Sequence, residues 1–232
     1  MKKIYIIILI ALSTNLFAQN TDADKLLNDV KTKFEKVNDY KVNVNIKLDI
    51  SFAKVPDTKA TIYFKKPDKV KFESEGFAMI PKESINFSPA QLLHGDYTAI
   101  YTKSENIDGR NLAVIKIIPN SDSTNFILTT MWIDPQYSLI RKVVINARRG
   151  GATTITFDYD NTEYSLPSKL LFSFNVGNVE VPEQMQQNPT QNNQRNRGRF
   201  RNMKLSGTVI VTYSNYVINK GIPDSVFEEK KK

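Results

Sequence analysis

The stretch KATIYFKKPDKVKFES, residues 59–74, carries the clearest fold signal in the chain. Apolar and polar residues alternate on both sides of its Pro67-Asp68 pair. A period of two residues that is interrupted by a turn-forming pair predicts two antiparallel strands, each with one apolar face. The apolar positions are Ala60, Ile62, Phe64, Val70 and Phe72.

Residues 42–52 show the same alternation over a longer span. Every second residue from Val42 to Phe52 is apolar, and every residue between them is polar. The two stretches together predict one large curved sheet with an apolar side.

The rest of the chain reads as an antiparallel meander. Turn-forming pairs such as Asp108-Gly109 and Asp134-Pro135 separate the candidate strands, and short connections imply antiparallel neighbours. The predicted strands are residues 97–103, 112–118, 126–133, 139–148, 152–159, 169–176 and 205–216. Residues 112–118 and 126–133 are apolar in both parities, which indicates strands covered on both faces or facing a ligand cavity.

Two helices are expected, and a short turn or helix is expected at residues 221–227. Residues 21–37 place Leu26, Leu27, Val30, Phe34 and Val37 on one helical face, which must pack against the sheet. A short helix is expected between Ser88-Pro89 and His94-Gly95, because proline favours the first helical turn and glycine the end.

The N-terminus has the features of a secretory signal peptide. Lys2 and Lys3 precede an apolar segment that is too short to span a bilayer, and cleavage is expected near Ala18. Loss of the leader lowers the formal net charge from +8 to +6. We therefore expect an exported, periplasmic protein whose single domain is residues 19–232, with anionic partners such as membrane surfaces or acidic proteins and no nucleic acid.

Residues 181–202 are rich in Gln, Asn and Arg and are expected to form a disordered or mobile loop. Two interpretations remain open for this segment, a solvated spacer and an anion-binding loop. The candidate anion contacts are Arg195, Arg197, Arg199 and Arg201.

The common catalytic constellations are missing from the sequence. The 232 residues contain one histidine, His94, and no cysteine, which excludes thiol chemistry, disulfides and the His-rich or Cys-rich metal sites. A Gly-x-Ser-x-Gly elbow and a Gly-rich phosphate loop are also absent. We expect a protein that is not an enzyme and that needs no cofactor or metal.

Three motifs, in this order, resemble a known family. They are the strand end Lys65-Lys66-Pro67, the strand and turn Trp132-Ile133-Asp134-Pro135, and the closing segment GIPDSVF at residues 221–227. With the exported helix and the long alternating strand, they are similar to the LolA-like periplasmic carriers of outer-membrane lipoproteins, including the LolA/LolB-like relatives. Each motif is short, and their order carries the resemblance.

The resemblance implies a mainly β (α+β) fold, with the single antiparallel sheet forming a half-open barrel. An N-terminal helix and short helices would cover its concave apolar face. A monomer of this kind would hold the acyl chains of lipoproteins or lipids, receive them from an inner-membrane releasing transporter and deliver them to an outer-membrane acceptor. Without knowing which strand parity faces the cavity, we take the lining as Ile46, Leu48, Ile62, Phe64, Phe72, Trp132 and Phe157, and the lid as Phe77, Met79, Ile80 and Phe87.

Lys66 departs from the family pattern. The family has an arginine before this proline, which helps to hold the lid closed, whereas lysine offers one ammonium in place of a planar fork. Lys66 is thus a lid-contact candidate, and a solvated turn lysine is the alternative.

Two other functions stay open at this point. The same fold could serve as an envelope sensor of lipids or lipoproteins that regulates a partner protein. Alternatively, the arginines of residues 195–201 could make the protein a module that binds an anionic surface.

Overall fold

The computed structural model describes residues 18–50, 53–54, 56–74, 93, 95–121, 125–148, 151–179 and 203–228. Within these residues one α-helix accompanies eleven strands of one antiparallel sheet. The elements are α2 (Ala18–Glu35), β1 (Asp39–Ile50), β2 (Ala53–Lys54), β3 (Thr58–Lys65), β4 (Lys69–Ser74), β5 (Tyr97–Ile107), β6 (Arg110–Pro119), β7 (Phe126–Asp134), β8 (Leu139–Ala147), β9 (Ala152–Asp158), β10 (Lys169–Val179), β11 (Met203–Ile218) and the 3-10 helix η4 (Asp224–Val226).

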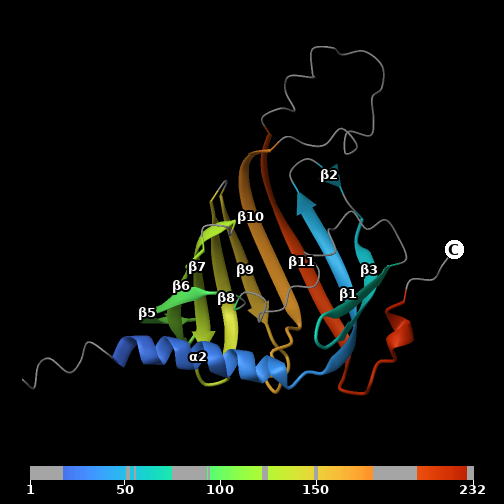
Figure 1. The fold of residues 1–232 in the computed structure, drawn as a ribbon. Helices are drawn as coiled ribbons and strands as arrows, with labels where there is room; N and C mark the ends of the chain where they lie inside the picture. Colours follow the sequence, from blue (N-terminus) through green and yellow to red (C-terminus); the bar gives the residue numbers. More distant parts are fainter. Residues whose placement is uncertain are drawn as a thin grey trace, which may run out of the picture.

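The sheet consists of two antiparallel meanders that are joined where β1 pairs with β11. Its strand order is β4-β3-β1-β11-β10-β9-β8-β7-β6-β5, with β2 paired to β1 off this path. Strands β4 and β5 are the two edges, so the sheet curves without closing (Figure 1). This architecture confirms the predicted half-open antiparallel barrel.

Local sequence signals account for the connections. Asp108 and Gly109, at the tip of the β5–β6 hairpin, both have positive φ, of 50° and 77°. Asp-Gly tolerates this pair of left-handed conformations, which the type I′ hairpin turn requires. All the long strands predicted from alternation and turn pairs are confirmed, whereas the two-residue β2 was not predicted.

Helix α2 crosses one end of the sheet (Figure 1). It begins three residues before the predicted Thr21 and ends two residues before the predicted Val37. Ala23, Leu27 and Val30 are at most 2% exposed, and they join the main apolar cluster of the sheet. We name the sheet face that meets α2 the inner face and the opposite one the outer face.

Several expectations fall on parts of the chain outside the described residues. They are the signal peptide up to Phe17, the lid residues Phe77, Met79, Ile80 and Phe87, the end of the short helix at His94, and the loop 181–202 with its four arginines. Among the described residues, no helix is long and apolar enough to cross a membrane.

Candidate functional site

The inner face carries a continuous row of apolar side chains. Residues that are paired across antiparallel strands lie on the same face, so the register defines the row. It runs through eight strands, from β1 to β5 by way of β11, and every member is apolar or aromatic. Its members are Leu48, Val209, Phe172, Ile155, Val143, Met131, Ile115 and Tyr101.

Exposure varies along this row. Ile155, Val143, Met131 and Ile115 are at most 1% exposed. Leu48, Val209 and Phe172, on the adjacent strands β1, β11 and β10, are only half-buried and pack against the same cluster. We name these three residues the inner apolar patch. Because these three side chains are only partly covered, a ligand can reach them without opening the buried core.

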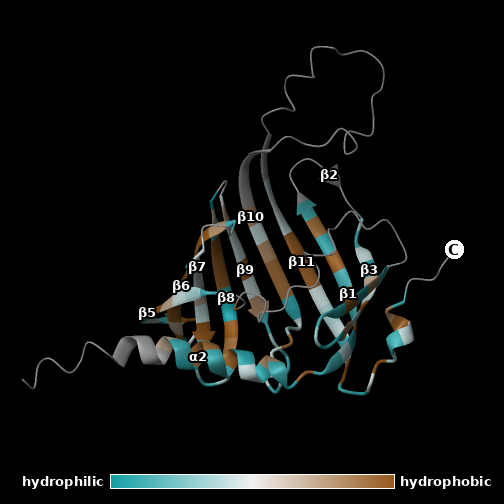
Figure 2. Cartoon of the chain, in the orientation of Figure 1, coloured by the Kyte–Doolittle hydropathy of each residue, from teal (hydrophilic) through white to brown (hydrophobic). Residues whose placement is uncertain are grey.

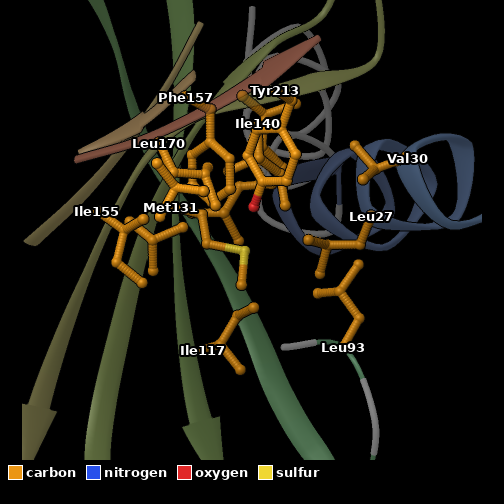
Figure 3. Close-up of a cluster of buried hydrophobic side chains, with 14 of the residues drawn as sticks. Leu27, Val30, Leu93, Ile117, Met131, Ile140, Ile155, Phe157, Leu170 and Tyr213 are labelled. Atoms are coloured by element: carbon orange, nitrogen blue, oxygen red, sulfur yellow. The ribbon is translucent and has the colours of Figure 1, made fainter. Parts of the chain in front are cut away.

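Below the inner apolar patch, a second row closes the base of the sheet. Ile46, Val211, Leu170 and Phe157 are paired across four strands and are at most 3% exposed. Figure 3 shows Phe157 and Leu170 beside Tyr213, with the side chains of α2 on the other side of the cluster. The helix therefore covers the base of the inner face by direct apolar packing.

Five of the seven predicted lining residues belong to this one cluster. Ile46, Ile62 and Phe157 are buried within it, and Leu48 and Phe72 are half-buried against it. Phe64 shares the inner face but lies in a smaller cluster with Val37 and Leu166. Its ring stacks on Tyr40, with 5.2 Å between the ring centroids. The structure thus brings six predicted residues to the inner face.

Trp132 is placed on the outer face. It is paired with Val114 and Lys142, while its neighbours Met131 and Ile133 point to the inner side and are fully buried. The Lys142 ammonium lies 4.4 Å from the centre of the Trp132 ring, and the indole N–H donates to Glu105 at 3.3 Å. Trp132 therefore drops out of the lining that we propose.

Lys66 lies at the end of α2. Its ammonium donates to the carbonyl oxygen of Glu35, and its backbone N–H donates to the carbonyl of Asn38 at 2.8 Å. A cation is favourable at a helix C-terminus, where the last carbonyls have no partner within the helix. Among the described residues, Lys66 thus binds the end of the helix, and its contact with the lid stays a prediction.

Asn219 completes this junction from the other end of the chain. Its amide nitrogen donates to the Lys36 carbonyl at 2.9 Å, and its side-chain oxygen accepts from the Asn38 N–H at 2.7 Å. Asn219 has a positive φ of 54°, a conformation that asparagine tolerates well. The end of α2 is therefore held by the β3–β4 turn and by the residue that follows β11.

The closing segment is fixed on the outer side of the β3–β4 hairpin. Asp224 accepts from Lys65 at 2.6 Å and Lys69 at 3.0 Å, and these ammonium groups lower the pKa of its carboxyl. Lys71 donates to the Val226 carbonyl at 2.7 Å. The predicted short turn or helix at residues 221–227 is confirmed as η4.

Three tyrosines line the base of the inner face, of which Tyr213 is buried and Tyr159 and Tyr216 are half-buried. The Tyr159 hydroxyl donates to the Ile140 carbonyl at 2.9 Å, and the Tyr216 hydroxyl donates to the Pro167 carbonyl at 2.8 Å. Burial raises the pKa of Tyr159, Tyr213 and Tyr216 above the ordinary tyrosine value. These hydroxyls stay protonated at neutral pH and add no charge to the apolar face.

Sequence reasoning missed Val209 and Phe172. Their strands were predicted. The apolar residues Leu170, Phe172 and Phe174 occupy every second position of one strand, and this alternation could have pointed to Phe172. The parity that faces inward, however, becomes clear only when both strands are paired with β1 and β9.

The described residues include no cluster of three or more His, Asp or Glu side chains placed to hold a metal ion.

An open, curved antiparallel sheet with an apolar inner face and a helix across its base defines a fold class of known proteins. The chain is similar over 89% of its length to a LolA superfamily protein from Nitrosomonas europaea, with 97% of that chain covered, 14% identity and a TM-score of 0.55. An outer membrane lipoprotein-sorting protein domain from Vibrio parahaemolyticus matches 90% of this chain and 97% of its own, with 12% identity and a TM-score of 0.56.

A DUF1329 family protein from Desulfovibrio piger gives a TM-score of 0.59, with 12% identity, 89% of this chain covered and 97% of that one. No family model matches the sequence. No curated protein matches it either. The fold is LolA-like, as the sequence motifs predicted, and identities this low establish the fold alone.

Proposed function

We propose that this protein is a periplasmic carrier that binds the acyl chains of lipoproteins or lipids on its inner face. The observation that carries the proposal is the row of apolar side chains from Leu48 to Tyr101, which crosses eight strands of a sheet that stays open. Hiding an acyl chain from water contributes about 0.8 kcal/mol per methylene, or on the order of 10 kcal/mol for a long chain. The row offers an apolar surface of matching chemistry.

Binding starts, in this proposal, at the inner apolar patch of Leu48, Val209 and Phe172. These side chains already lie at the surface of the cluster, so an acyl chain can cover them without opening the base that α2 closes. Phe77, Met79, Ile80 and Phe87 form the movable cover, as the sequence predicted. Lys66 and Asn219 keep α2 in place while that cover moves.

The cellular role follows from the same proposal. The signal peptide directs export, and the carrier takes its cargo from a releasing transporter at the inner membrane and delivers it to an outer-membrane acceptor. The work is transfer without bond making or breaking, which agrees with the single histidine and the lack of cysteine in the sequence.

Purification from envelope extracts tests the proposal. Mass spectrometry of the native protein should detect bound lipid or acylated protein, and the delipidated protein should take up an acylated peptide saturably. If neither cargo nor saturable uptake is found, the carrier function is wrong. Capture of a membrane-bound regulator, with no cargo, would point to the sensor function.

A further inference from the structure

The outer face of the sheet is rich in cations. The register places these side chains on it: Lys41, Lys47, Lys59, Lys65, Lys69, Lys71, Lys103, Arg110, Lys116, Lys142 and Lys169. Among the described residues, the carboxylates that the register places on the same face include Asp39, Asp49, Glu73, Glu105, Asp134 and Asp158. Figure 2 shows the hydrophilic bands that alternate with apolar ones along the strands. The outer face thus carries a positive charge that the apolar inner face lacks.

Three of the four cations of β3 and β4 on this face are already engaged. Lys65 and Lys69 bind Asp224, and Lys71 binds the Val226 carbonyl of the closing segment. At the other end of the sheet, over β5 to β8, the outer face carries exposed and half-buried lysines. Lys103, Lys116 and Lys142 lie there with Glu105 as the neighbouring carboxylate.

Exposed isoleucines lie among these lysines. Ile100 is 38% exposed and is paired directly with Lys116, while Ile118 is 39% exposed and is two residues further along the same strand face. Single exposed apolar residues are common on protein surfaces, but here they alternate with lysine on one sheet face. We name Ile100, Lys103, Lys116, Ile118 and Lys142 the outer basic patch.

The patch surrounds packed side chains on the same face. Leu112 and Val114 are 2% and 3% exposed, and Val114 is paired with Trp132. Lys103 binds Glu105 at 2.9 Å, and Glu105 accepts from the Trp132 indole. Lys142 covers the indole ring. These contacts hold the surrounding side chains, while Lys116 and the two isoleucines project outward.

We propose that the outer basic patch contacts the surface of a bilayer that contains anionic lipids. Lysine ammonium groups attract anionic headgroups with about 1 kcal/mol each close to the surface, or about fivefold in affinity. Apolar side chains beside them enter the boundary between headgroups and acyl chains. Alternating lysine and isoleucine fits this layered surface, and flexible lysine stems need no headgroup of fixed geometry.

A bilayer is favoured over an acidic protein as the occupant. Tight protein recognition of carboxylates uses forked arginines in defined pockets. The outer basic patch instead presents point charges on an open sheet face. The contact is separate from the inner face, so it is tested independently of acyl-chain uptake.

Co-sedimentation with vesicles tests the contact. The delipidated full chain is mixed with vesicles of phosphatidylcholine alone or of phosphatidylcholine with phosphatidylglycerol, at low and high salt. We expect binding to the anionic vesicles only, weakening as salt screens the charges. Lys116→Gln should lower the affinity about fivefold, and Ile118→Ser should lower it by roughly threefold or more because less apolar area is buried.

Matched variants show whether vesicle binding depends on this patch or on any exposed lysine or apolar residue. Lys31→Gln removes an exposed lysine of α2, and Val217→Ser removes an apolar residue of β11 that is 46% exposed and lies outside the outer basic patch, beside Lys41. Both should bind vesicles like the parent, and all variants should keep the parent's circular dichroism spectrum and uptake of acylated peptide. A deletion of residues 183–200 tests the arginine loop.

Three results would overturn the inference. The first is a parent protein that does not bind anionic vesicles. If such a protein binds polyglutamate instead, the partner of the patch is an acidic protein. The second is Lys31→Gln weakening binding as much as Lys116→Gln. The third is binding that is lost on deletion of residues 183–200 and unchanged in Lys116→Gln and Ile118→Ser.

Discussion

Lys66 shows how one residue connects several parts of this fold. It follows β3 directly, its ammonium binds the last turn of α2, and its backbone N–H binds the segment that leads into β1. Lysine can make this contact because a single carbonyl needs only one donor, so the planar fork of arginine is not required.

Replacing Lys66 tests its role at the helix end. Lys66→Ala should destabilise the protein by about 0.5–1 kcal/mol, because a favourable charge at the helix C-terminus is lost. Hydrogen exchange in the last turn of α2 should become faster. Lys66→Arg should restore both properties, since the guanidinium can reach the same carbonyl. Equal exchange in the parent and in Lys66→Ala would show that the contact does not hold the helix.

Phe157 and Trp132 test the assignment of the two sheet faces. Phe157→Ala should lower the free energy of unfolding by about 3–5 kcal/mol, because it leaves a cavity in the main cluster. Trp132→Ala should cost clearly less, because its half-buried ring packs on the outer face and makes no contact with that cluster. Urea denaturation of both variants measures the difference. A larger loss for Trp132→Ala would contradict the placement of Trp132.

At the scale of elements, local patterns explain most of what could be predicted. The alternation from Val42 to Leu48 marks β1 because Val42, Val44 and Ile46 are buried, and Asp108-Gly109 marks the β5–β6 turn because both residues adopt positive φ. The strands, the amphipathic helix and the short closing helix were all visible in this way. Each of these elements is specified by residues that are close together in the sequence.

Long-range pairing could not be predicted in the same manner. β1 lies between β3 and β11, and the pairing with β11 joins residues far apart in sequence. Trp132 was assigned to the inner face because its strand is apolar in both parities, so alternation gives no direction there. A register shift between Trp132 and Ile133 adds to this ambiguity. Only the pairing with Val114 and Lys142 decides which face the ring occupies.

Neighbouring positions on β11 offer a matched test of the inner face. Val209 and Ile210 are both half-buried aliphatic residues, but they point to opposite faces. Val209→Asn should reduce the uptake of an acylated peptide severalfold, because it puts an unpaired amide into the inner apolar patch. Ile210→Asn should leave uptake near the parent level. Fluorescence titration with a labelled acyl probe measures both, and equal losses would contradict inner-face binding.

At the scale of the whole molecule, the curved sheet separates two kinds of surface. The inner face collects the apolar rows and the tyrosines Tyr159, Tyr213 and Tyr216, and the outer face collects most of the strand lysines. The closing segment and Asn219 connect the C-terminal end of the sheet to the β3–β4 hairpin and to α2. An open sheet therefore keeps its shape without closing into a barrel.

Alkaline pH should destabilise the fold through its tyrosines. The pKa values of Tyr159, Tyr213 and Tyr216 are raised in the folded state, so these hydroxyls ionise more easily after unfolding. Their contribution is complete below the unfolded pKa, about 10, and is lost as pH rises above it. Each tyrosine should add a slope of about 1.4 kcal/mol per pH unit.

Urea denaturation between pH 8 and pH 11 measures this loss. Tyr159→Phe should show a shallower decline above pH 10 than the parent, because one titrating group is gone. At pH 8 the same variant should lose only about 0.5–1.5 kcal/mol, for the hydrogen bond to Ile140. A stability that stays level through pH 11 in the parent would show that these hydroxyls are not buried.

Photo-crosslinking tests the central claim most directly. A peptide whose acyl chain carries a diazirine is bound to the delipidated protein and irradiated, and the labelled residues are identified by mass spectrometry. Binding on the inner face predicts that labels concentrate on Leu48, Val209 and Phe172, and that unlabelled acylated peptide competes them away. Labels confined to outer-face residues such as Leu171 and Ile210, or no labelling that competitor reduces, would contradict the claim.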